Sequence, residues 1–290
     1  MSDKATVLVT GSTGMIGSAA VKGLVERGHN VIGVDRRQSD FLNEIFTQVV
    51  CELSDKDKLC EIFEKYKIDR VVHLAALAHT AGEEDLSYDR YYHINVECAV
   101  NIFELAAAHS APVLFSSTAD VYGFVKGVAT ADTVPEPVTA YGKTKYLAEC
   151  ELEKIASKHG LQYTIFRFAP VYTQSVKRDI QKRYYLKYPK IAYIVGKGTE
   201  YEFLSIETAV KSIADWADEI PENKIYNVKD TDRVNTAQCI AKEKSEGRAN
   251  IVFYFPRWVV RFGFAVIKVL TGKNKYTFLI NKAVNPLITE

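Results

Sequence analysis

The sequence predicts an α/β fold, with a doubly wound and mainly parallel sheet that carries helices on both faces. Strand-length apolar segments alternate with helical patterns through the first two thirds of the 290 residues, and this alternation is typical of βαβ units. A glycine-rich turn at residues 11–17 joins the first strand segment to the first helical segment. Hydrophobic residues make up 47% of the chain, which is enough to form a substantial core.

The alternation defines the expected elements of the N-terminal two thirds one by one. Strands are predicted at residues 5–9, 30–34, 47–51, 71–76, 112–117 and 163–167, and helices at residues 18–27, 55–66, 88–109 and 141–158. Ser54 stands where the second of these helices needs an N-cap.

Beyond residue 170 the pattern becomes less regular. Short strands are predicted at residues 191–195, 203–206 and 225–228, and helices at residues 208–219 and 236–246. The sequence shows no low-complexity linker and no internal repeat. We therefore expect residues 171–290 to form a small α/β lobe, packed on and partly interleaved with a larger domain of residues 1–170.

Residues 251–270 are rich in Phe, Val and Ile, a composition found in membrane elements. The stretch contains Pro256, Arg257, Arg261 and Lys268, which disfavours a membrane-spanning helix. We expect a buried or surface-packed amphipathic helix here. Because all of its charges are basic, a peripheral membrane contact is the alternative.

Composition limits the function classes further. The formal net charge is +1, which gives no indication of a nucleic-acid surface. The five cysteines form no CxxC motif and no cluster with histidine, so we expect no metal site and a reducing compartment. The first residues lead directly into a strand without a signal peptide, and a cytoplasmic location is expected.

The glycine turn is typical of a dinucleotide site. Gly11 permits the tight turn, Gly14 lets the backbone approach a pyrophosphate, and Gly17 lets the helix pack close to the strand. The N–H groups at the helix start then face the anion. Asp35 follows 18 residues after Gly17, at the end of the second strand, where a carboxylate can accept hydrogen bonds from the adenosine ribose. These features predict an NAD(P) site that prefers NAD, in which Arg36 stacks on the adenine or lies in solvent. If Asp35 turns away, Arg36 could instead clamp the 2′-phosphate of NADP.

A tyrosine and a lysine are placed for acid–base chemistry. Tyr141 and Lys145 are four residues apart at a helix start and therefore share one face. A lysine ammonium favours the phenolate and lowers the pKa of tyrosine, which can then exchange a proton with a hydroxyl or carbonyl. A surface pair is the alternative. Ser116 and Ser117, just past a strand, could bond the same substrate oxygen, although turn capping is the alternative for one of them.

Four motifs follow one another along the chain, namely the three-glycine turn, His-Leu-Ala-Ala at residues 73–76, the segment 115–123 and Tyr-x-x-x-Lys at residues 141–145. In these motifs and their order the chain resembles the extended short-chain dehydrogenases/reductases, in particular the NAD-dependent epimerase/dehydratase family that acts on nucleotide sugars. The resemblance covers residues 5–230. It implies a Rossmann-type sheet domain with a small C-terminal α/β substrate lobe.

The resemblance also implies roles for individual residues. Thr118 takes the catalytic Ser/Thr position, Tyr141 is the acid/base and Lys145 is the nicotinamide ribose partner. The implied cofactor-binding residues are Gly11, Thr13, Gly14, Met15, Ile16, Asp35, Arg36, Glu52, Leu53, Leu74, Ala75, Ala76, Ser116, Tyr141 and Lys145. The implied substrate-binding residues are His79, Ser117, Thr118, Lys182 and Arg183. For His79 a loop residue without a special role is the alternative, and for Lys182 and Arg183 a solvated helix face. Asn95 lies where the family places a structural or active-site asparagine.

Three positions depart from the family pattern. Pro170 stands where many members carry an asparagine that contacts the substrate diphosphate, and Glu52 replaces the usual Asp near the adenine. Ala119 follows Thr118 where 4,6-dehydratases carry an acid, which argues against a conventional dehydratase. Asp120 is then either a base or a solvated loop carboxylate.

The resemblance implies an enzyme that epimerises a nucleotide-diphosphate sugar through a keto-sugar intermediate with NAD. An NAD(P)H-dependent reductase of a 4-keto nucleotide sugar is the first alternative, and a non-catalytic NAD(P)-sensing protein is the second. The helices at residues 88–109 and 141–158 resemble the family's dimer helices, so we expect a homodimer.

Overall fold

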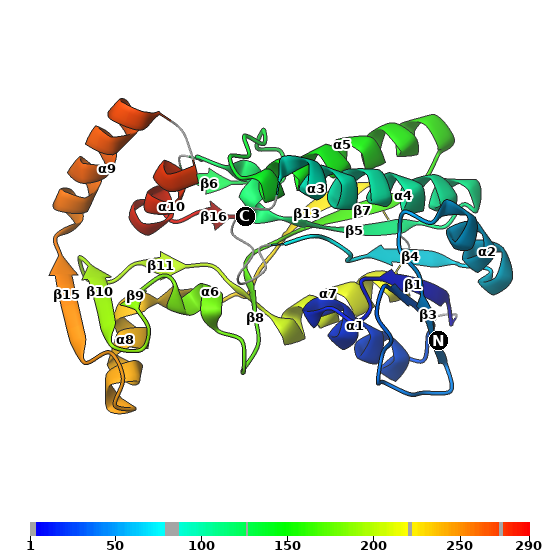
Figure 1. The fold of residues 1–290 in the computed structure, drawn as a ribbon, viewed down its shortest axis with the longest axis horizontal. Helices are drawn as coiled ribbons and strands as arrows, with labels where there is room; N and C mark the ends of the chain where they lie inside the picture. Colours follow the sequence, from blue (N-terminus) through cyan, green and yellow to red (C-terminus); the bar gives the residue numbers. More distant parts are fainter. Residues whose placement is uncertain (1–3, 79–86, 126, 220–221, 273–274) are drawn as a thin grey trace. The chain divides into compact units, whose positions relative to one another are not determined.

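The computed structural model describes residues 4–78, 87–125, 127–219, 222–272 and 275–290 (Figure 1). The chain divides into two compact units. Unit 1 comprises Met1–Val121, Ala140–Phe168 and Ile206–Val228, and unit 2 comprises Tyr122–Thr139, Ala169–Ser205 and Lys229–Glu290. The chain therefore passes several times from one unit to the other.

Unit 1 is built on a seven-stranded sheet whose order is β13-β7-β5-β4-β1-β2-β3. The strands are β1 Thr6–Thr10, β2 Asn30–Asp35, β3 Phe46–Val50, β4 Arg70–His73, β5 Val113–Thr118, β7 Tyr163–Phe168 and β13 Lys224–Val228. All neighbouring strands in this sheet pair in parallel. The predicted doubly wound parallel sheet is confirmed. Because the strand order reverses between β1 and β4, the switch point lies at their carboxyl ends, where such sheets bind ligands.

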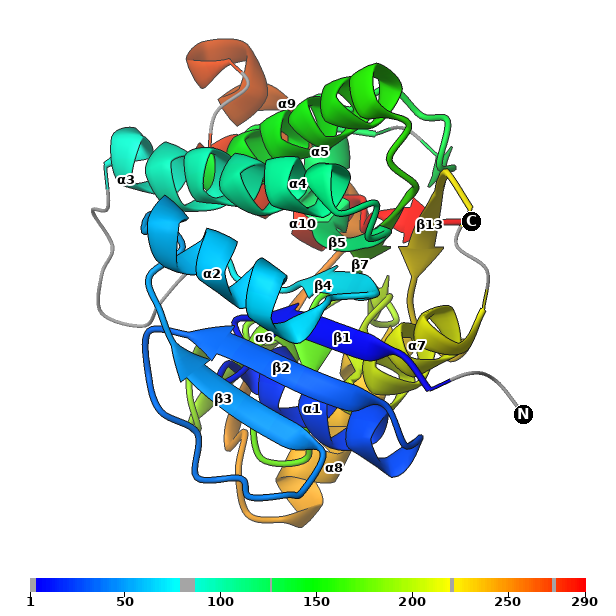
Figure 2. The same ribbon diagram turned by 90° about the vertical axis from the view of Figure 1, so that its right-hand side faces the viewer.

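Helices cover both faces of this sheet (Figure 2). They are α1 Met15–Glu26, α2 Lys56–Tyr66, α3 Tyr88–Tyr92, α4 Cys98–Ala108, α5 Ala140–His159 and α7 Ile206–Asp218. α1 and α7 pack together on one face, while α2, α4 and α5 lie on the other. The core cluster that includes Phe63 of α2, Ile102 of α4 and Leu152 of α5 joins the second group to the sheet.

Two predicted helices differ from the observed ones in detail. The N-cap of α2 is Asp55, whose carboxylate accepts a hydrogen bond from the N–H of Lys58 at 3.1 Å, so the prediction of Ser54 was wrong. The predicted helix at residues 88–109 is interrupted by a π-helical turn at His93–Glu97 between α3 and α4. Such a turn accommodates one extra residue in the helical ladder and is frequent at functional sites.

Unit 2 contains a three-stranded sheet and three two-stranded ones. Its strands are β6 Val128–Ala129, β8 Val171–Tyr172, β9 Tyr185–Lys187, β10 Ile191–Val195, β11 Glu200–Tyr201, β12 Leu204–Ser205, β14 Val234–Asn235, β15 Ile251–Phe255 and β16 Ile288–Thr289. Its helices are α6 Arg178–Gln181, α8 Thr236–Ser245, α9 Arg257–Thr271 and α10 Lys275–Val284. Its own core cluster is rich in aromatic side chains such as Tyr184, Tyr201 and Phe203.

The sequence predicted a single helix at residues 251–270, and this prediction was wrong. Ile251–Phe255 forms β15, which pairs in parallel with β10, and Arg257–Thr271 forms α9. Pro256 separates the two elements. Proline disfavours helical backbone in the residue before it, and the β-branched and aromatic residues of β15 suit a strand.

The turn between β1 and α1 brings three backbone segments close together. Gly11 has a φ of +69°, and a Cβ there would lie 2.9 Å from the Cα of Ala75 in the segment after β4. A Cβ on Gly17 would lie 2.0 Å from the carbonyl oxygen of Gly11. Because real Cβ atoms do not approach a carbonyl oxygen so closely, α1 can begin here only with glycine at position 17.

We expect Gly17→Ala to lower the free energy of unfolding by about 1–3 kcal/mol, because the added methyl group must displace backbone in a packed turn. Urea unfolding monitored by circular dichroism measures this change. Gly263→Ala is the matched control, since a Cβ there meets nothing within 4 Å. Equal stabilities of the two variants would contradict the packing described for the turn.

Candidate active site

The glycine turn presents backbone donors at the carboxyl end of β1. The N–H of Gly11 donates to the Val34 carbonyl and that of Gly14 to the Gly11 carbonyl, both at 2.9 Å. Gly14 is the N-cap of α1, has extended backbone and makes no side-chain cap hydrogen bond. In the first turn of α1, which contains no acidic residue, Met15 is exposed and Ile16 is half-buried. The helix start is thus shaped to receive a negative charge.

An unsatisfied hydroxyl supports this interpretation of the turn. The Oγ1 atom of Thr13 is buried and has no hydrogen-bond partner among the described residues. Buried polar atoms are normally paired, and an orphaned one in a binding turn calls for an explanation such as a ligand. A pyrophosphate oxygen would satisfy both this hydroxyl and the amides of the helix start. The residues present therefore fit the phosphates of a dinucleotide.

Asp35 is fixed beside the turn. Its Oδ2 atom accepts a hydrogen bond from the N–H of Thr13, and its Oδ1 atom accepts one from the N–H of Arg37, both at 3.1 Å. The carboxylate is 8% exposed, and the Nε of Arg37 lies 3.8 Å from Oδ1. Arg37, and not Arg36, is therefore the arginine that pairs with Asp35. Each carboxylate oxygen retains capacity to accept a further hydrogen bond.

Glu52 and Leu53 follow the neighbouring strand. The N–H of Cys51 donates to the carbonyl of Asp35 at 2.9 Å, which brings the segment after β3 beside the end of β2. Glu52 is exposed, whereas Leu53 packs on the core and its carbonyl accepts from the Asn101 amide at 2.9 Å.

The His-Leu-Ala-Ala segment lies at the switch point. The N–H of Leu74 donates to the Thr10 carbonyl and that of Ala75 to the Thr10 hydroxyl, each at 3.3 Å. Thr10 Oγ1 also lies 2.9 Å from Nδ1 of His73. Leu74, Ala75 and Ala76 are half-buried. These contacts hold the segment after β4 against the glycine turn, as expected of a wall of the cofactor site.

His73 is a buried, neutral group behind this wall. Burial first, and then the charge of Lys145, lower the pKa of His73 to about 3. Its ring stacks on Phe115 with the centroids 5.8 Å apart, and its Nε2 atom has no partner among the described residues. The sequence offered His73 only as part of a motif, and no periodicity indicated its neighbours.

Helix α5 carries the acid–base residues. Tyr141, Lys145 and Glu149 recur every four residues and share one face of the helix. Lys145 is buried, and its Nζ atom lies over the Phe115 ring at 3.9 Å from the centroid. Burial lowers the pKa of Lys145 to about 7, against the opposing effect of the Glu149 charge.

The expected lowering of the tyrosine pKa is not found. Burial first, and then the charges of Asp120 and Tyr91, raise the pKa of Tyr141 above its usual value. Burial penalises the charged phenolate, and the Asp120 carboxylate repels it. Tyr141 is therefore protonated at neutral pH in this structure.

Thr118 lies at the end of β5, where a 3-10 turn at Ala119–Tyr122 follows. Its Oγ1 atom accepts a hydrogen bond from the N–H of Asp120 at 3.2 Å. Because the Asp120 charge also acts on Tyr141, this turn places Thr118 and Tyr141 in one neighbourhood.

Ser116 and Ser117 both donate their hydroxyl protons to acceptors within the protein. Ser116 donates to the His73 carbonyl at 3.1 Å, and Ser117 donates to Oε1 of Glu149. Arg167 completes a buried network, since its Nη2 atom lies 2.7 Å from Oε2 and its Nε atom 3.2 Å from Oε1 of Glu149. Toward a ligand, each serine oxygen is therefore placed to accept a hydrogen bond. Sequence reasoning missed Glu149, although its place two helical turns after Tyr141 was a signal.

Asn95 connects the segment after β4 to α5. The π-helical turn holds Asn95 buried, where its Oδ1 accepts from the N–H of Leu77 at 2.7 Å and its Nδ2 donates to the Leu77 carbonyl at 3.1 Å. The same Nδ2 donates to Oγ1 of Thr144 at 3.0 Å. Thr144 precedes Lys145 on α5, so Asn95 positions the helix that carries the acid–base pair.

Three further residues were predicted to bind substrate, namely His79, Lys182 and Arg183. His79 lies outside the described residues. Lys182 and Arg183 belong to unit 2, where Lys182 is exposed and lies 3.5 Å from Asp179. The Arg183 guanidinium lies 5.2 Å from the Tyr201 ring centroid, and its buried Nε has no partner among the described residues.

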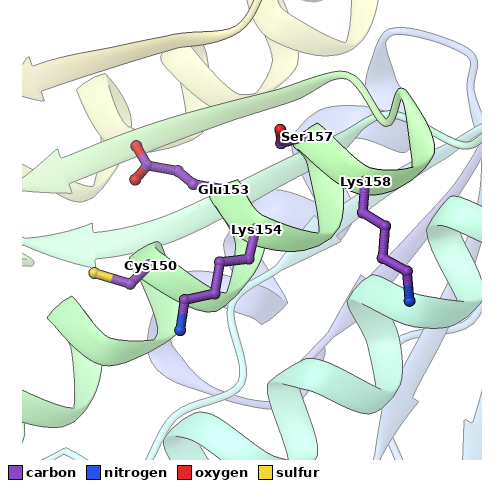
Figure 3. Close-up of a pocket in the computed structure, with 5 residues that line it drawn as sticks. All are labelled: Cys150, Glu153, Lys154, Ser157 and Lys158. Atoms are coloured by element: carbon purple, nitrogen blue, oxygen red, sulfur yellow. The ribbon is translucent and has the colours of Figure 1, made fainter.

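A hollow on α5 is separate from these groups. Figure 3 shows its lining residues Cys150, Glu153, Lys154, Ser157 and Lys158, all on this one helix. None of them is a predicted site residue. The chemistry described above is therefore located at the strand ends of the sheet and not in this hollow.

The fold and the glycine turn define a Rossmann-type nucleotide-binding protein. The chain belongs to the NAD dependent epimerase/dehydratase family, whose model matches residues 7–228. This finding confirms the family resemblance seen in the sequence.

Curated relatives match about half of the chain. A UDP-glucose 4-epimerase of Corynebacterium glutamicum is 31% identical over 165 residues, which is 56% of this chain and 50% of that protein. UDP-glucose 4-epimerase 2 of Oryza sativa subsp. japonica is 35% identical over 161 residues, which is 50% of this chain and 39% of that protein. The chain thus spans half or less of the length of these relatives.

Solved structures match over more of the chain. The UDP-glucose 4-epimerase of Thermotoga maritima, solved with UDP-glucose, has a TM-score of 0.71 and 28% identity, covering 87% of this chain and 85% of that one. MoeE5, solved with UDP-glucuronic acid and NAD, has a TM-score of 0.70 and 26% identity over the same shares.

We expect Glu149→Gln to destabilise the protein by about 3–5 kcal/mol, because it removes the carboxylate charge that forms a buried ion pair with Arg167. Urea unfolding at neutral pH measures this loss. Glu151→Gln on the same helix is the matched control, since the Glu151–Lys154 pair is exposed and such pairs contribute about 0–1 kcal/mol. A loss no larger than that of the control would show that the buried pair does not stabilise the fold.

Proposed function

We propose that this chain catalyses NAD-dependent epimerisation of a nucleotide-diphosphate sugar, with a UDP-sugar as the first substrate to test. The observation that supports the proposal is that β5, which ends at Thr118, and α5, which carries Tyr141 and Lys145, belong to the same unit, with Lys145 Nζ over the Phe115 ring of β5. The UDP-sugars named for the structures from Thermotoga maritima and of MoeE5 support the choice of substrate.

In the proposed reaction, the glycine turn and Asp35 would hold NAD⁺, which would supply the hydride acceptor for the sugar carbon and the hydride donor for the opposite face of the keto sugar. With NAD⁺ bound, Tyr141 must first release its own proton to solvent, which a positive nicotinamide charge would favour. Its phenolate then takes the hydroxyl proton as the carbonyl forms, and the phenol gives a proton back on reduction. The Thr118 hydroxyl holds the reacting oxygen. Lys145 lies one helical turn after Tyr141, and its pKa of about 7 leaves it partly protonated at neutral pH. In the proposed reaction its positive charge would favour the phenolate.

The raised pKa of Tyr141 also favours a second candidate, an NAD(P)H-dependent reductase of a 4-keto nucleotide sugar. A protonated phenol is ready to act as an acid when a carbonyl is reduced. The two candidates differ in cofactor exchange, because an epimerase regenerates its cofactor in each cycle. Absorbance of the supernatant after denaturing the purified protein distinguishes tightly retained NAD from none. The presence of all three acid–base residues argues against a non-catalytic NAD(P)-sensing protein.

We expect Tyr141→Phe to lower turnover by about 10²–10⁴-fold while cofactor binding persists, because only the hydroxyl that exchanges the proton is lost. Conversion of UDP-, GDP- and dTDP-sugars measures the activity, and NADH fluorescence measures binding. Tyr146→Phe on the same helix is the control and should remain active. A Tyr141→Phe rate above about a tenth of the wild-type rate would refute the proposed role.

We expect NADH to bind more tightly than NADPH by at least about tenfold, since a 2′-phosphate would meet the nearly buried Asp35 carboxylate and be repelled. Fluorescence titrations of both nucleotides at matched ionic strength test this preference. Asp35→Ala should reduce the difference, and Arg36→Ala should leave it unchanged. Tighter binding of NADPH would mean that Asp35 is not the ribose ligand.

A further inference from the structure

Net positive charge is concentrated at the C-terminal end of the sequence, because acidic residues are absent there. Residues 247–289 contain no acidic residue, and all 36 acidic residues of the chain lie outside this stretch. Its basic residues are Arg248, Arg257, Arg261, Lys268, Lys273, Lys275 and Lys282. A chain with a net charge of only +1 therefore contains one strongly cationic segment.

Helix α9 within this segment has two distinct stripes. Arg257, Arg261 and Lys268 are spaced by four and seven residues, which places them on one side of a helix. Trp258, Phe262 and Val269 repeat the same spacing one residue later and form an apolar stripe beside the basic one. These three apolar side chains are 72%, 69% and 85% exposed, and no described residue of α9 is buried.

A second side of α9 faces the rest of unit 2, and its half-buried residues are Val260, Gly263, Phe264 and Lys268. Arg257 and Arg261 are exposed. Within the basic stripe, Arg257 donates to the Gly198 carbonyl at 3.2 Å and Lys268 lies 5.5 Å from the Phe124 ring centroid. The apolar stripe that contains Trp258 lies outside this half-buried side, where an ordinary surface helix carries polar residues.

Strand β15, which precedes α9, also exposes apolar side chains. It leads through Pro256 directly into α9 (Figure 1). Its exposed apolar side chains are Ile251, Phe253, Tyr254 and Phe255. We call these four residues, together with the basic and apolar stripes of α9, the β15–α9 surface.

We propose that the β15–α9 surface binds an anionic lipid bilayer, with α9 lying in the plane of the interface. Helices that lie in this way combine Trp, Phe and aliphatic side chains on one side with Lys and Arg beside them. Tryptophan and tyrosine favour the level of the headgroups, and long basic side chains can reach the lipid phosphates from the same depth. This inference does not depend on the proposed catalytic function.

Two observations favour a lipid surface in the interfacial mode. A second copy of the chain seated on the same patch by two-fold symmetry would bring two cationic stripes together, which opposes self-association. The three basic residues of α9 disfavour burial of the helix across a bilayer but suit its interface. In the described part of the chain, no helix has both the length and the apolarity needed to cross a membrane.

The two tryptophans of the chain provide a direct assay. Trp216 is 5% exposed and donates to Thr164 Oγ1 at 2.9 Å, so its emission should not change, whereas Trp258 is exposed. We expect a blue shift of tryptophan emission, and co-flotation of the full chain, with phosphatidylglycerol–phosphatidylcholine vesicles but not with phosphatidylcholine alone. Trp258→Phe should abolish the shift while retaining flotation. Salt should weaken the binding.

Charge and apolar variants test the two stripes separately. Arg261→Glu should weaken binding by about tenfold or more, and Lys56→Glu, the same charge change on α2 of unit 1, should have little effect. Phe262→Ser should also reduce binding, and Leu42→Ser, at an exposed leucine of unit 1, should not. Absence of binding to anionic vesicles, or equal binding to neutral ones, would overturn the proposal. So would a Trp258 blue shift that grows with protein concentration without vesicles, because a second copy would then cover the surface.

Discussion

The approach of three backbone segments at the carboxyl end of β1 is the constraint on which the candidate site depends. The glycine turn, the start of α1 and the segment after β4 leave no room for a Cβ at Gly11 or Gly17. The hydroxyl of Thr10 stabilises this arrangement through its hydrogen bonds with Nδ1 of His73 and the N–H of Ala75. Since the helix start and the Thr13 hydroxyl reach the same edge, the phosphate-facing part of the site consists largely of backbone. Changes in side chains elsewhere should leave it intact.

The buried charges beside α5 explain the electrostatics of the other half of the site. Glu149 forms an ion pair with Arg167, and its charge also raises the pKa of Lys145. One carboxylate therefore interacts with two buried basic groups. The excess positive charge contributes to keeping His73 neutral and favours a negative group arriving nearby. At Tyr141 itself, burial and the Asp120 charge raise the pKa of the phenol and so disfavour the phenolate. The protein therefore holds the phenol protonated until a further positive charge or a reacting oxygen alters the balance.

Structural features that follow from local sequence patterns were predicted correctly, whereas features that depend on residues distant in the sequence were not. Alternating strands and helices, and glycines at fixed spacing, are local, and they led to the correct sheet, turn and family. The N-cap was misplaced because Ser54 and Asp55 are both capable caps, and only the observed bond to Lys58 decides. The strand at Ile251–Phe255 was missed because a short apolar run fits a strand and a helix equally. The pKa of Tyr141 required Asp120 and Tyr91, which the fold alone brings close.

Helix α9 shows a different limit of sequence patterns, because an amphipathic pattern states that two sides differ but not which side faces the protein. Here Val260 and Phe264 lie on the half-buried side, and a second group of apolar side chains that includes Trp258 is left exposed. Charge segregation adds a longer-range effect. Since every acidic residue lies outside residues 247–289, an anionic surface attracts this segment and repels the net negative remainder. The same distribution that brings the chain to such a surface would therefore also orient it, with the β15–α9 surface foremost.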